Sequence, residues 1–358
     1  MNNNVIKVGT FFSGIGSPEK ALERLKNEKV IDDYELMFFS EIDKYAVKSY
    51  CAIHDIDERL NLGDIKDIKG VDLPYCDLWI GGFPCQDISC AGRMRGFDLN
   101  TSTRSSLGWE MIRLLKEVNQ KPKYVIFENV EMITSKKFKD TLSLFKKDLE
   151  DIGYKLYDKV LIATDYEIPQ IRKRYFVVAI LDDEKEFNFP EKKELKSILK
   201  DYLDNTVDNK YYLTNNDYKV LDNGNMLFKK YNNDDILYEI DLKKAYSGGV
   251  CGVDKRTKFN QSSRVFSIFG NCPTLTANNT GDNCKILVGN NIDFRIRKLT
   301  AKEAWRLMGF DDSDYNKAIK VCSESQLYHQ AGNSIVVNVI YYLLENIISI
   351  HSNWFLYF

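Results

Sequence analysis

The chain has 358 residues and a hydrophobic fraction of 44%, which suits one large or two moderate folded domains and excludes a mostly disordered protein. Its net charge of −2 gives no whole-molecule argument for a nucleic-acid partner, so positive charge for such a partner has to be local. There is no apolar stretch of about 18 residues, no basic and apolar start, and no C-x-x-C pair among the 8 cysteines, so we expect a reduced cytoplasmic protein without membrane span, secretory signal or metal site.

Strands and helices are expected to alternate in the first half of the chain. The apolar run 5–12 predicts a strand that ends in a glycine-rich turn at 13–16. Ser17 can then cap a helix with its hydroxyl, and Pro18 suits the first helical position. Further strands are expected at 35–40, 78–81, 124–127 and 175–181, with helices after Asp43 and over 109–118. This alternation predicts an α/β fold with a mainly parallel sheet and helices on both faces.

The composition changes near Phe187. From there to about residue 293 the chain is rich in Asn, Asp, Lys and Tyr and has only short apolar runs. A helix is expected again around 300–308, and the strongly apolar segment 335–348 predicts a terminal helix. We therefore divide the chain into an α/β domain at 1–187, a smaller β- and loop-rich domain with a hinge at 188–325, and a C-terminal helix at 326–358 that returns to the first domain.

The turn after the first strand and two acidic residues are candidate nucleotide contacts. Glycines in the turn let the backbone approach a nucleotide at the carboxyl edge of a sheet. Glu19 stands where the dinucleotide fingerprint needs its third glycine, which argues against NAD. Glu41, after the second strand, can accept hydrogen bonds from ribose hydroxyls or be a solvated strand-end carboxylate. Asp64 can accept from an adenine amino group or form a turn.

Cys85 follows Pro84 at the end of a buried strand, where it faces the crevice in which α/β sheets bind ligands. A free thiol has a pKa of ~8.5, so it needs help from helix ends or from nearby positive charges to form a thiolate at neutral pH. The basic residues that follow are Arg93, Arg95 and Arg104. Four other cysteines are expected to be inert core residues: Cys51, Cys76, Cys251 and Cys272.

Glu128 ends the next strand after Cys85. A carboxylic acid beside a thiol is the pair needed to add a thiolate to an electron-poor ring. The segment 170–174 then carries three positive charges in five residues, which suit phosphate and base oxygens or form a solvated edge.

The order of these motifs resembles the bacterial-type DNA cytosine-C5 methyltransferase family. The motifs are F-x-G-x-G at 12–16, P-C-Q at 84–86, E-N-V at 128–130, Q-x-R-x-R at 170–174 and Q-x-G-N-S at 330–334. They span nearly the whole chain, and Ile335 stands where the family typically has valine. The resemblance implies a Rossmann-like, S-adenosylmethionine-dependent methyltransferase sheet with a smaller target-recognition domain.

The resemblance also implies a mechanism and a set of site residues. Cytosine flips out of the duplex, Cys85 adds to C6, Glu128 acts on N3, and Arg172 and Arg174 hold the base, with Arg174 at O2. The residues implied at the cofactor are Phe12, Ser13, Gly14, Ile15, Gly16, Glu41, Ile42, Asp64, Ile65, Pro84, Leu107, Asn333 and Ser334. The residues implied at DNA, several of them in a mobile loop at 86–104, are Gln86, Ser89, Arg93, Arg95, Arg104, Arg264, Thr274 and Thr276.

Three other classes were weighed against this one. Zinc-dependent cytosine deaminases need H-x-E and P-C-x-x-C, but no histidine here is followed two residues on by glutamate, and Ile88 stands three residues after Cys85. The tRNA-methylating branch of the family tends to have Pro-Pro-Cys, whereas Phe83 precedes Pro84 here; this branch is the alternative substrate class. A catalytically dead DNA-binding relative is disfavoured by the intact catalytic residues.

The expected partner is double-stranded DNA, and the expected cofactor is S-adenosyl-L-methionine. We expect a monomer that belongs to a restriction-modification system or acts as an orphan methylase. The target sequence and a cognate restriction endonuclease stay open, because residues 188–290 follow no general recognition code.

Overall fold

The computed structural model describes residues 5–84, 107–181, 186–213, 265–277, 284–289 and 295–350, and the backbone alone of 228–231, 237–240, 251–252, 264 and 294. The chain forms two compact units. Unit 1 comprises Met1–Ile162, Lys173–Lys192 and Val337–Phe358, and unit 2 comprises Ala163–Arg172 and Lys193–Val336. The sequence-based boundaries at 187 and 325 stay a prediction. The units differ from them, because 163–172 already belongs to unit 2, and because unit 2 continues through 336.

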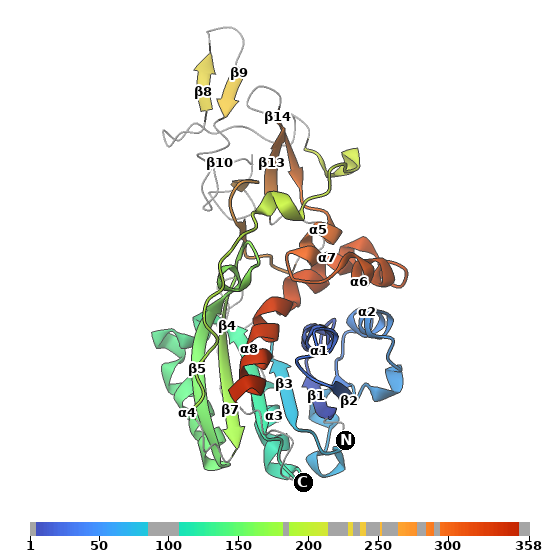
Figure 1. Cartoon of the computed structure of the whole chain (residues 1–358), viewed down its shortest axis with the longest axis vertical. Coiled ribbons are helices and arrows are strands. Elements are labelled where there is room, and N and C mark those ends of the chain that lie inside the picture. Colours follow the sequence, from blue (N-terminus) through green and yellow to red (C-terminus); the bar gives the residue numbers. More distant parts are fainter. Residues whose placement is uncertain are drawn as a thin grey trace. The chain divides into compact units, whose positions relative to one another are not determined.

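Unit 1 is built on a six-stranded sheet of order β2-β1-β3-β4-β7-β5 (Figure 1). The strands are β1 (Val5–Phe11), β2 (Asp33–Ser40), β3 (Leu78–Gly82), β4 (Tyr124–Val130), β5 (Tyr154–Ile162) and β7 (Lys173–Leu181). β1 pairs in parallel with β2 and β3, and β3 pairs in parallel with β4. β7 runs antiparallel to both β4 and β5. The predicted, mainly parallel α/β sheet is confirmed, and β7 is its one reversed strand.

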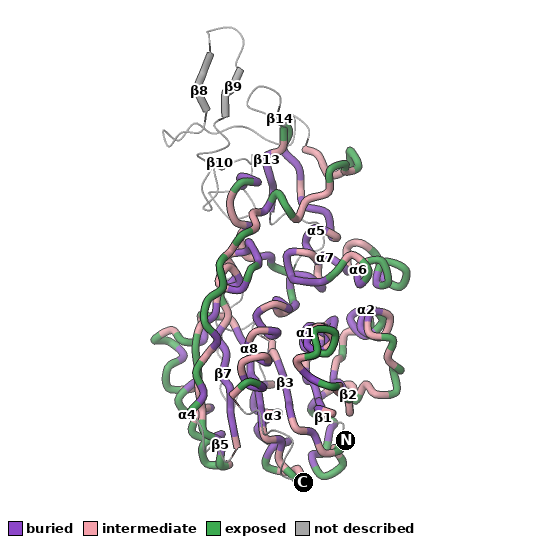
Figure 2. The backbone as a smooth tube through the Cα atoms, viewed as in Figure 1, coloured by how far each residue is buried: buried purple, intermediate pink, exposed green. Residues whose placement is uncertain are grey.

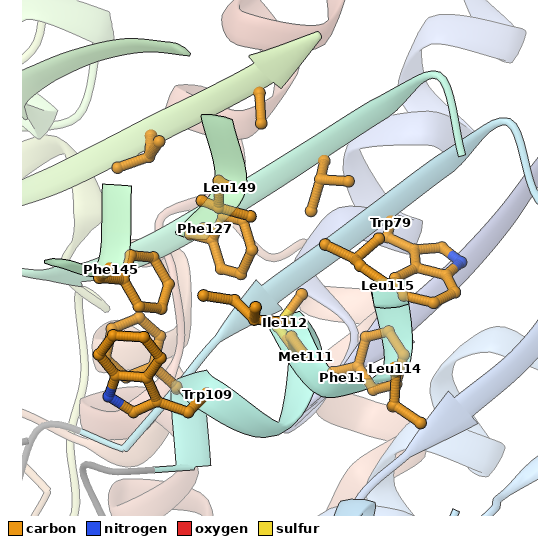
Figure 3. Packing of buried hydrophobic residues seen from close by; sticks show 14 of the residues in the cluster. Phe11, Trp79, Trp109, Met111, Ile112, Leu114, Leu115, Phe127, Phe145 and Leu149 are labelled. Carbon is orange, nitrogen blue, oxygen red and sulfur yellow. The ribbon is translucent and has the colours of Figure 1, made fainter. Parts of the chain in front are cut away.

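Helices cover both faces of this sheet. They are α1 (Ser17–Asn27), α2 (Lys44–His54), α3 (Gly108–Glu117), α4 (Lys139–Asp151) and α8 (Val337–Ile350). α3 and α4 pack on the face that carries Phe11, Trp79 and Phe127 (Figure 3). α1 lies on the opposite face, since its Glu19 bonds to Thr10 of β1, and α1 packs against α8 (Figure 1). As a consequence, β3, β4 and β7 are buried along most of their length (Figure 2).

The start of α1 differs from the prediction by one residue. Ser17 was expected to cap the helix, but it is the first helical residue, and Gly16 occupies the N-cap position with φ 80° and no side-chain cap. Gly16 takes this role because glycine adopts the left-handed conformation without a steric cost. Pro18 was expected at the first helical position and is the second helical residue, still within the first turn, where its missing N–H leaves no helical hydrogen bond unmade.

The predicted terminal helix is present as α8. Together with the helix before it, the stretch Glu324–Ile350 has the length and apolar composition of a membrane-crossing helix. It is interrupted at 334–336, and most residues of α8 are buried. In addition, the Tyr341 hydroxyl donates to Glu28 Oε2 at 2.6 Å, which ties α8 to the end of α1. α8 therefore packs as a core helix of unit 1.

Unit 2 contains three small sheets and three α-helices in the part of the chain that the structure describes. A four-stranded sheet has the order β10-β11-β13-β14, β8 pairs with β9, and β6 pairs with β12. The strands are β6 (Gln170–Ile171), β8 (Phe228–Tyr231), β9 (Leu237–Ile240), β10 (Cys251–Gly252), β11 (Arg264–Ser267), β12 (Cys272–Pro273), β13 (Lys285–Gly289) and β14 (Phe294–Lys298). The helices are α5 (Ala301–Arg306), α6 (Asp312–Ala318) and α7 (Glu324–Asn333). This composition agrees with the expected smaller, β-rich domain.

Candidate active site

The turn between β1 and α1 has an unusual backbone. Phe12, Gly14 and Gly16 have φ angles of 53°, 57° and 80°. A Cβ on Gly16 would lie 2.0 Å from His54 Nε2, whereas a Cβ on Gly14 would meet nothing within 4 Å. Gly16 is therefore required for close packing, and Gly14 leaves its backbone open to a ligand.

Glu41 binds this turn to the end of β2. Its carboxylate accepts hydrogen bonds from the backbone N–H of Gly14 at 2.9 Å and from those of Ile42 and Asp43 at 2.8 Å each. Burial raises the pKa of the Glu41 carboxyl, and the three backbone donors oppose that rise. The side chain of Ile42 is 70% exposed and offers an apolar surface beside the carboxylate.

Asn61 was missed by the sequence analysis. Its Oδ1 accepts from the N–H of Glu41 at 3.0 Å and from the N–H of Gly63 at 3.1 Å, so it joins the Glu41 and Asp64 segments. Asp64 caps a short helix by accepting from Lys66 N–H at 3.0 Å, and Ile65 is buried. In the sequence, Asn61 is only a polar residue two positions before Gly63, and this pattern did not indicate a role for it.

Glu41, Ile42 and Gly14 meet the requirements of an adenosyl group. A ribose needs hydroxyl acceptors, a purine needs an apolar surface, and a close ligand needs accessible backbone. The carboxyl ends of parallel strands β1 and β2 bring these three features to one edge of the sheet. The residues therefore fit the adenosyl part of S-adenosylmethionine.

A second cluster lies on β3 and β4. Gly82 pairs with Glu128 across the two strands, and Asn129 Nδ2 donates to the Phe83 carbonyl at 3.0 Å. Asn129, which the sequence analysis did not single out, thus holds the end of β3 just before Pro84. Leu107 is half-buried at the start of α3. The predicted residues outside the described part of the chain are Cys85, Gln86, Ser89, Arg93, Arg95 and Arg104.

Glu128 and Arg174 form an ion pair in unit 1. Arg174 Nε lies 3.0 Å from Glu128 Oε1, and their side chains are 16% and 11% exposed. Arg174 pairs with Val130 in the antiparallel β4–β7 ladder. Because residues two apart on a strand share a face, Arg174 and Glu128 are diagonal neighbours on one face of the sheet. The structure therefore brings one predicted catalytic arginine to the predicted catalytic acid.

Arg172 belongs to unit 2, where its guanidinium is buried. Nη1 donates to the Leu275 carbonyl at 2.7 Å, and Nη2 donates to the carbonyls of Gly332 at 3.0 Å and Ser334 at 2.7 Å. Gln170 adds to this brace, since its Oε1 accepts from the N–H of Leu275 at 3.0 Å. The side chains of Gln170 and Arg172 thereby hold the backbone at Leu275 and the backbone of the motif at 330–334.

The remaining predicted residues of unit 2 surround this brace. A Cβ on Gly332 would lie 2.2 Å from the backbone N of Ala277, so only glycine permits this approach. Thr274 Oγ1 donates to the Ile171 carbonyl at 2.6 Å, while Thr276 is exposed. Asn333 is exposed near His329 at the end of α7. Only the backbone of Arg264 is described.

Comparisons with known proteins agree with this arrangement. The family model of the C-5 cytosine-specific DNA methylases matches residues 6–349. The orphan methyltransferase M.SPRI of Bacillus phage SPR is 31% identical, over 97% of this chain and 98% of that protein. The type II methyltransferase M.HhaI of Haemophilus parahaemolyticus is 33% identical, over 94% of this chain and 92% of that protein.

Solved structures show the same fold. The S. pombe Dnmt2 methyltransferase superposes with a TM-score of 0.67 at 20% identity, covering 96% of this chain and 98% of that one. The Entamoeba histolytica methyltransferase EhMeth gives a TM-score of 0.64 at 23% identity, covering 97% of this chain and 98% of that one. The resemblance seen in the motifs is confirmed: the chain belongs to the C-5 cytosine-specific DNA methylase family and is a DNA (cytosine-5-)-methyltransferase.

Proposed function

We propose that this enzyme methylates C5 of a cytosine that is flipped out of a specific double-stranded DNA sequence, with S-adenosylmethionine as methyl donor. The observation that carries the proposal is the Glu128–Arg174 pair, 3.0 Å apart. It lies on β4 and β7, beside β3, the strand that leads into Pro84 and Cys85. An acid and a cation next to the strand of a nucleophile suit addition to a cytosine ring.

The cofactor site is proposed at the carboxyl edge of β1 and β2. Glu41 would accept from the ribose hydroxyls, Ile42 would cover the adenine, and the backbone of Gly14 would approach the ligand. S-adenosylmethionine supplies an electrophilic methyl group when it is bound there. The other residues proposed to line the site are Phe12, Ser13, Ile15, Gly16, Asp64, Ile65, Pro84, Leu107, Asn333 and Ser334.

The chemistry is proposed to begin with covalent addition to the base. The Cys85 thiolate adds to C6 while Glu128 gives a proton to N3, which turns C5 into a nucleophilic carbon, and Arg174 binds O2 of the ring. C5 then takes the methyl group and loses its proton to water. The C5–C6 double bond re-forms as the Cys85 sulfur leaves, and N3 returns its proton to Glu128. Extrusion of the base costs roughly a few kcal/mol, which DNA contacts have to offset.

DNA contacts are proposed from both units. Basic residues of segment 86–104 would grip the DNA, whereas Arg264, Thr274 and Thr276 would serve recognition. Arg172 was expected at the base, but its guanidinium is buried against backbone carbonyls, so we propose that it supports the segment of Thr274 and Thr276 instead. Because arginine contacts to phosphate release bound counterions, the affinity of the enzyme for DNA should fall as the salt concentration rises. The relatives named above are called orphan and type II methyltransferases, which supports an enzyme that either acts alone or accompanies a restriction endonuclease. We also propose that it acts as a monomer in the cytoplasm.

Trapping on a fluorinated substrate tests the proposal. A long duplex in which 5-fluorocytosine replaces cytosine offers every target sequence, and its C5 fluorine cannot leave as a proton does. With S-adenosylmethionine, we expect the wild-type enzyme to form an adduct that survives denaturing electrophoresis. Cys85→Ala should form none, while Cys51→Ala, at a half-buried thiol, should still form it. An adduct with Cys85→Ala, or methylation of tRNA but not DNA, would contradict the proposal.

A further inference from the structure

Glu19 is a fully buried acid beside the proposed cofactor turn. It stands in the first turn of α1, and its exposed fraction is 0%. Its Oε1 accepts hydrogen bonds from the Thr10 hydroxyl at 2.7 Å and the Tyr50 hydroxyl at 2.8 Å. Oε2 is buried and makes no hydrogen bond. Burying an acid with one oxygen unsatisfied costs stability, so the position calls for an explanation.

The hydrogen bonds of Glu19 lead into the turn. Thr10 Oγ1 is also 2.9 Å from Ser13 Oγ. A hydroxyl has one proton, and Thr10 gives its proton to Glu19 Oε1, so the hydroxyl of Ser13 is the donor to Thr10. The Ser40 carbonyl competes for the same Ser13 proton, but it lies farther away, at 3.4 Å. The direction of these hydrogen bonds is set at Glu19, whose Oε1 accepts from the hydroxyls of both Thr10 and Tyr50.

The same turn is held from its other side. The backbone N–H of Ser13 donates to the Ser40 carbonyl at 3.2 Å, and the N–H of Gly14 donates to Glu41 at 2.9 Å. The turn is thus held by Glu19, through Thr10 and Ser13, and by Glu41, through Gly14. Its neighbour Phe12 has a φ of 53°, which a residue with a side chain keeps only where surrounding contacts hold it.

We infer that Glu19 is a positioning residue for the cofactor: through Thr10 and Ser13 it holds the turn in the conformation to which S-adenosylmethionine binds. This inference rests on the proposed function. Glu19 itself is buried and is not proposed to touch the ligand. Its removal should loosen the turn while α1 stays in place, because Leu22 and Leu25 remain buried.

Cofactor affinity is the measurement that separates positioning from folding. For Glu19→Ala, we expect the Kd of S-adenosylmethionine by calorimetry, and its KM, to rise about tenfold, as loss of one hydrogen-bond route predicts. At saturating cofactor, kcat should stay within about twofold, because the turn is then held by the ligand. Glu19→Gln keeps an oxygen for Thr10 and should restore the affinity to within about threefold.

Two further variants complete the test. Thr10→Val removes the middle hydroxyl with little change of shape and should weaken cofactor binding as Glu19→Ala does, even if Glu19→Ala fails to fold. Glu23→Ala, on the same helix but half-exposed and paired with Lys20, should bind like the wild type. Normal affinity in Thr10→Val, or a Gln variant as weak as the Ala variant, would overturn the inference. A wild-type enzyme that does not bind S-adenosylmethionine would instead contradict the proposed function.

Discussion

The two arginines of the motif Q-x-R-x-R at 170–174 lie in different units and make different contacts. Arg174 is partly exposed in unit 1 and faces a carboxylate. Arg172 is 3% exposed in unit 2, and its guanidinium donates to backbone carbonyls. A guanidinium group that keeps some contact with solvent can exchange its protein partner for a substrate. A guanidinium group whose hydrogen bonds go to buried backbone carbonyls instead holds separate segments of the chain together. The motif therefore combines a group suited to chemistry with a group suited to architecture.

Gly14 in unit 1 and Gly332 in unit 2 differ in the space that a side chain would have. Gly14 in unit 1 has free space where a side chain would stand, which suits a ligand. Gly332 in unit 2 has the backbone of Ala277 at that place, which suits close packing. Both glycines belong to motifs of one family, but Gly14 leaves space for a ligand, whereas Gly332 allows two backbone segments to touch.

The largest effect is expected at the acid of unit 1. Glu128→Gln keeps the shape of the side chain but removes the acid, so turnover should fall on the order of 10²–10⁴-fold, as for general acid–base catalysis. The melting temperature should stay near that of the wild type. Glu131→Gln, an exposed acid that pairs with Lys173, is the matched control and should turn over normally. An unfolded Glu128 variant, or one with full turnover, would remove Glu128 from the chemistry.

The two arginines should separate stability from activity. Arg172→Met leaves three carbonyls without this donor, so the free energy of unfolding, measured in urea, should fall by roughly 3 kcal/mol. Arg174→Met should lower that free energy by less than Arg172→Met does, since one contact to a partly exposed carboxylate is lost rather than three to buried carbonyls. It should instead lower methyl transfer about tenfold or more, because a charge-assisted contact to the base is lost. If Arg172→Met is as stable as the wild type and Arg174→Met is strongly destabilised, the assignment of Arg172 to architecture and of Arg174 to chemistry is wrong.

A smaller loss is expected from Gly332→Ala. The added methyl group would meet the backbone at Ala277, and such overpacking costs about 1–3 kcal/mol. Thermal unfolding checks this, with Gln326→Ala on the same helix as the control. If the alanine variant melts with the wild type, the two segments do not approach as closely as the structure indicates.

The smallest effect is expected from surface charges of unit 2. Hydrogen bonds from Arg306 and Lys302 lower the pKa of Asp312 below its usual value of 3.8. A lowered pKa means that the stabilisation is present above that value and is lost as the pH falls below it. Asp312→Asn should therefore cost under about 1 kcal/mol at pH 7, since the carboxylate is 44% exposed, and the difference from the wild type should vanish in acid. A difference that does not change with pH would assign the loss to shape rather than charge.

Much of unit 1 was predictable because its signals are local. Apolar runs, a proline at a helix start and glycine-rich turns depend on neighbours in the chain. They placed β1, β2, β3, β4 and β7 and the helices α1, α2, α3 and α8 within a few residues, whereas α4 and β5 were not predicted. Glu41 and Glu128 were predictable as candidates for the same reason, since Glu41 directly follows β2 and Glu128 lies near the carboxyl end of β4. The Gly16 cap was missed, because the choice between Gly16 and Ser17 depends on the left-handed backbone and on the approach of His54.

The sequence by itself determined the α/β alternation, the order of the motifs and, through them, the family. Only the tertiary structure decided the antiparallel direction of β7, the pairing of Arg174 with Glu128, and the burial of Glu19 behind the turn. It also decided that Arg172 braces segments more than a hundred residues away in the chain. The physical reason is the same in each case. Hydrogen bonds and ion pairs between distant segments depend on which strands become neighbours in the sheet, and a local sequence pattern does not specify those neighbours.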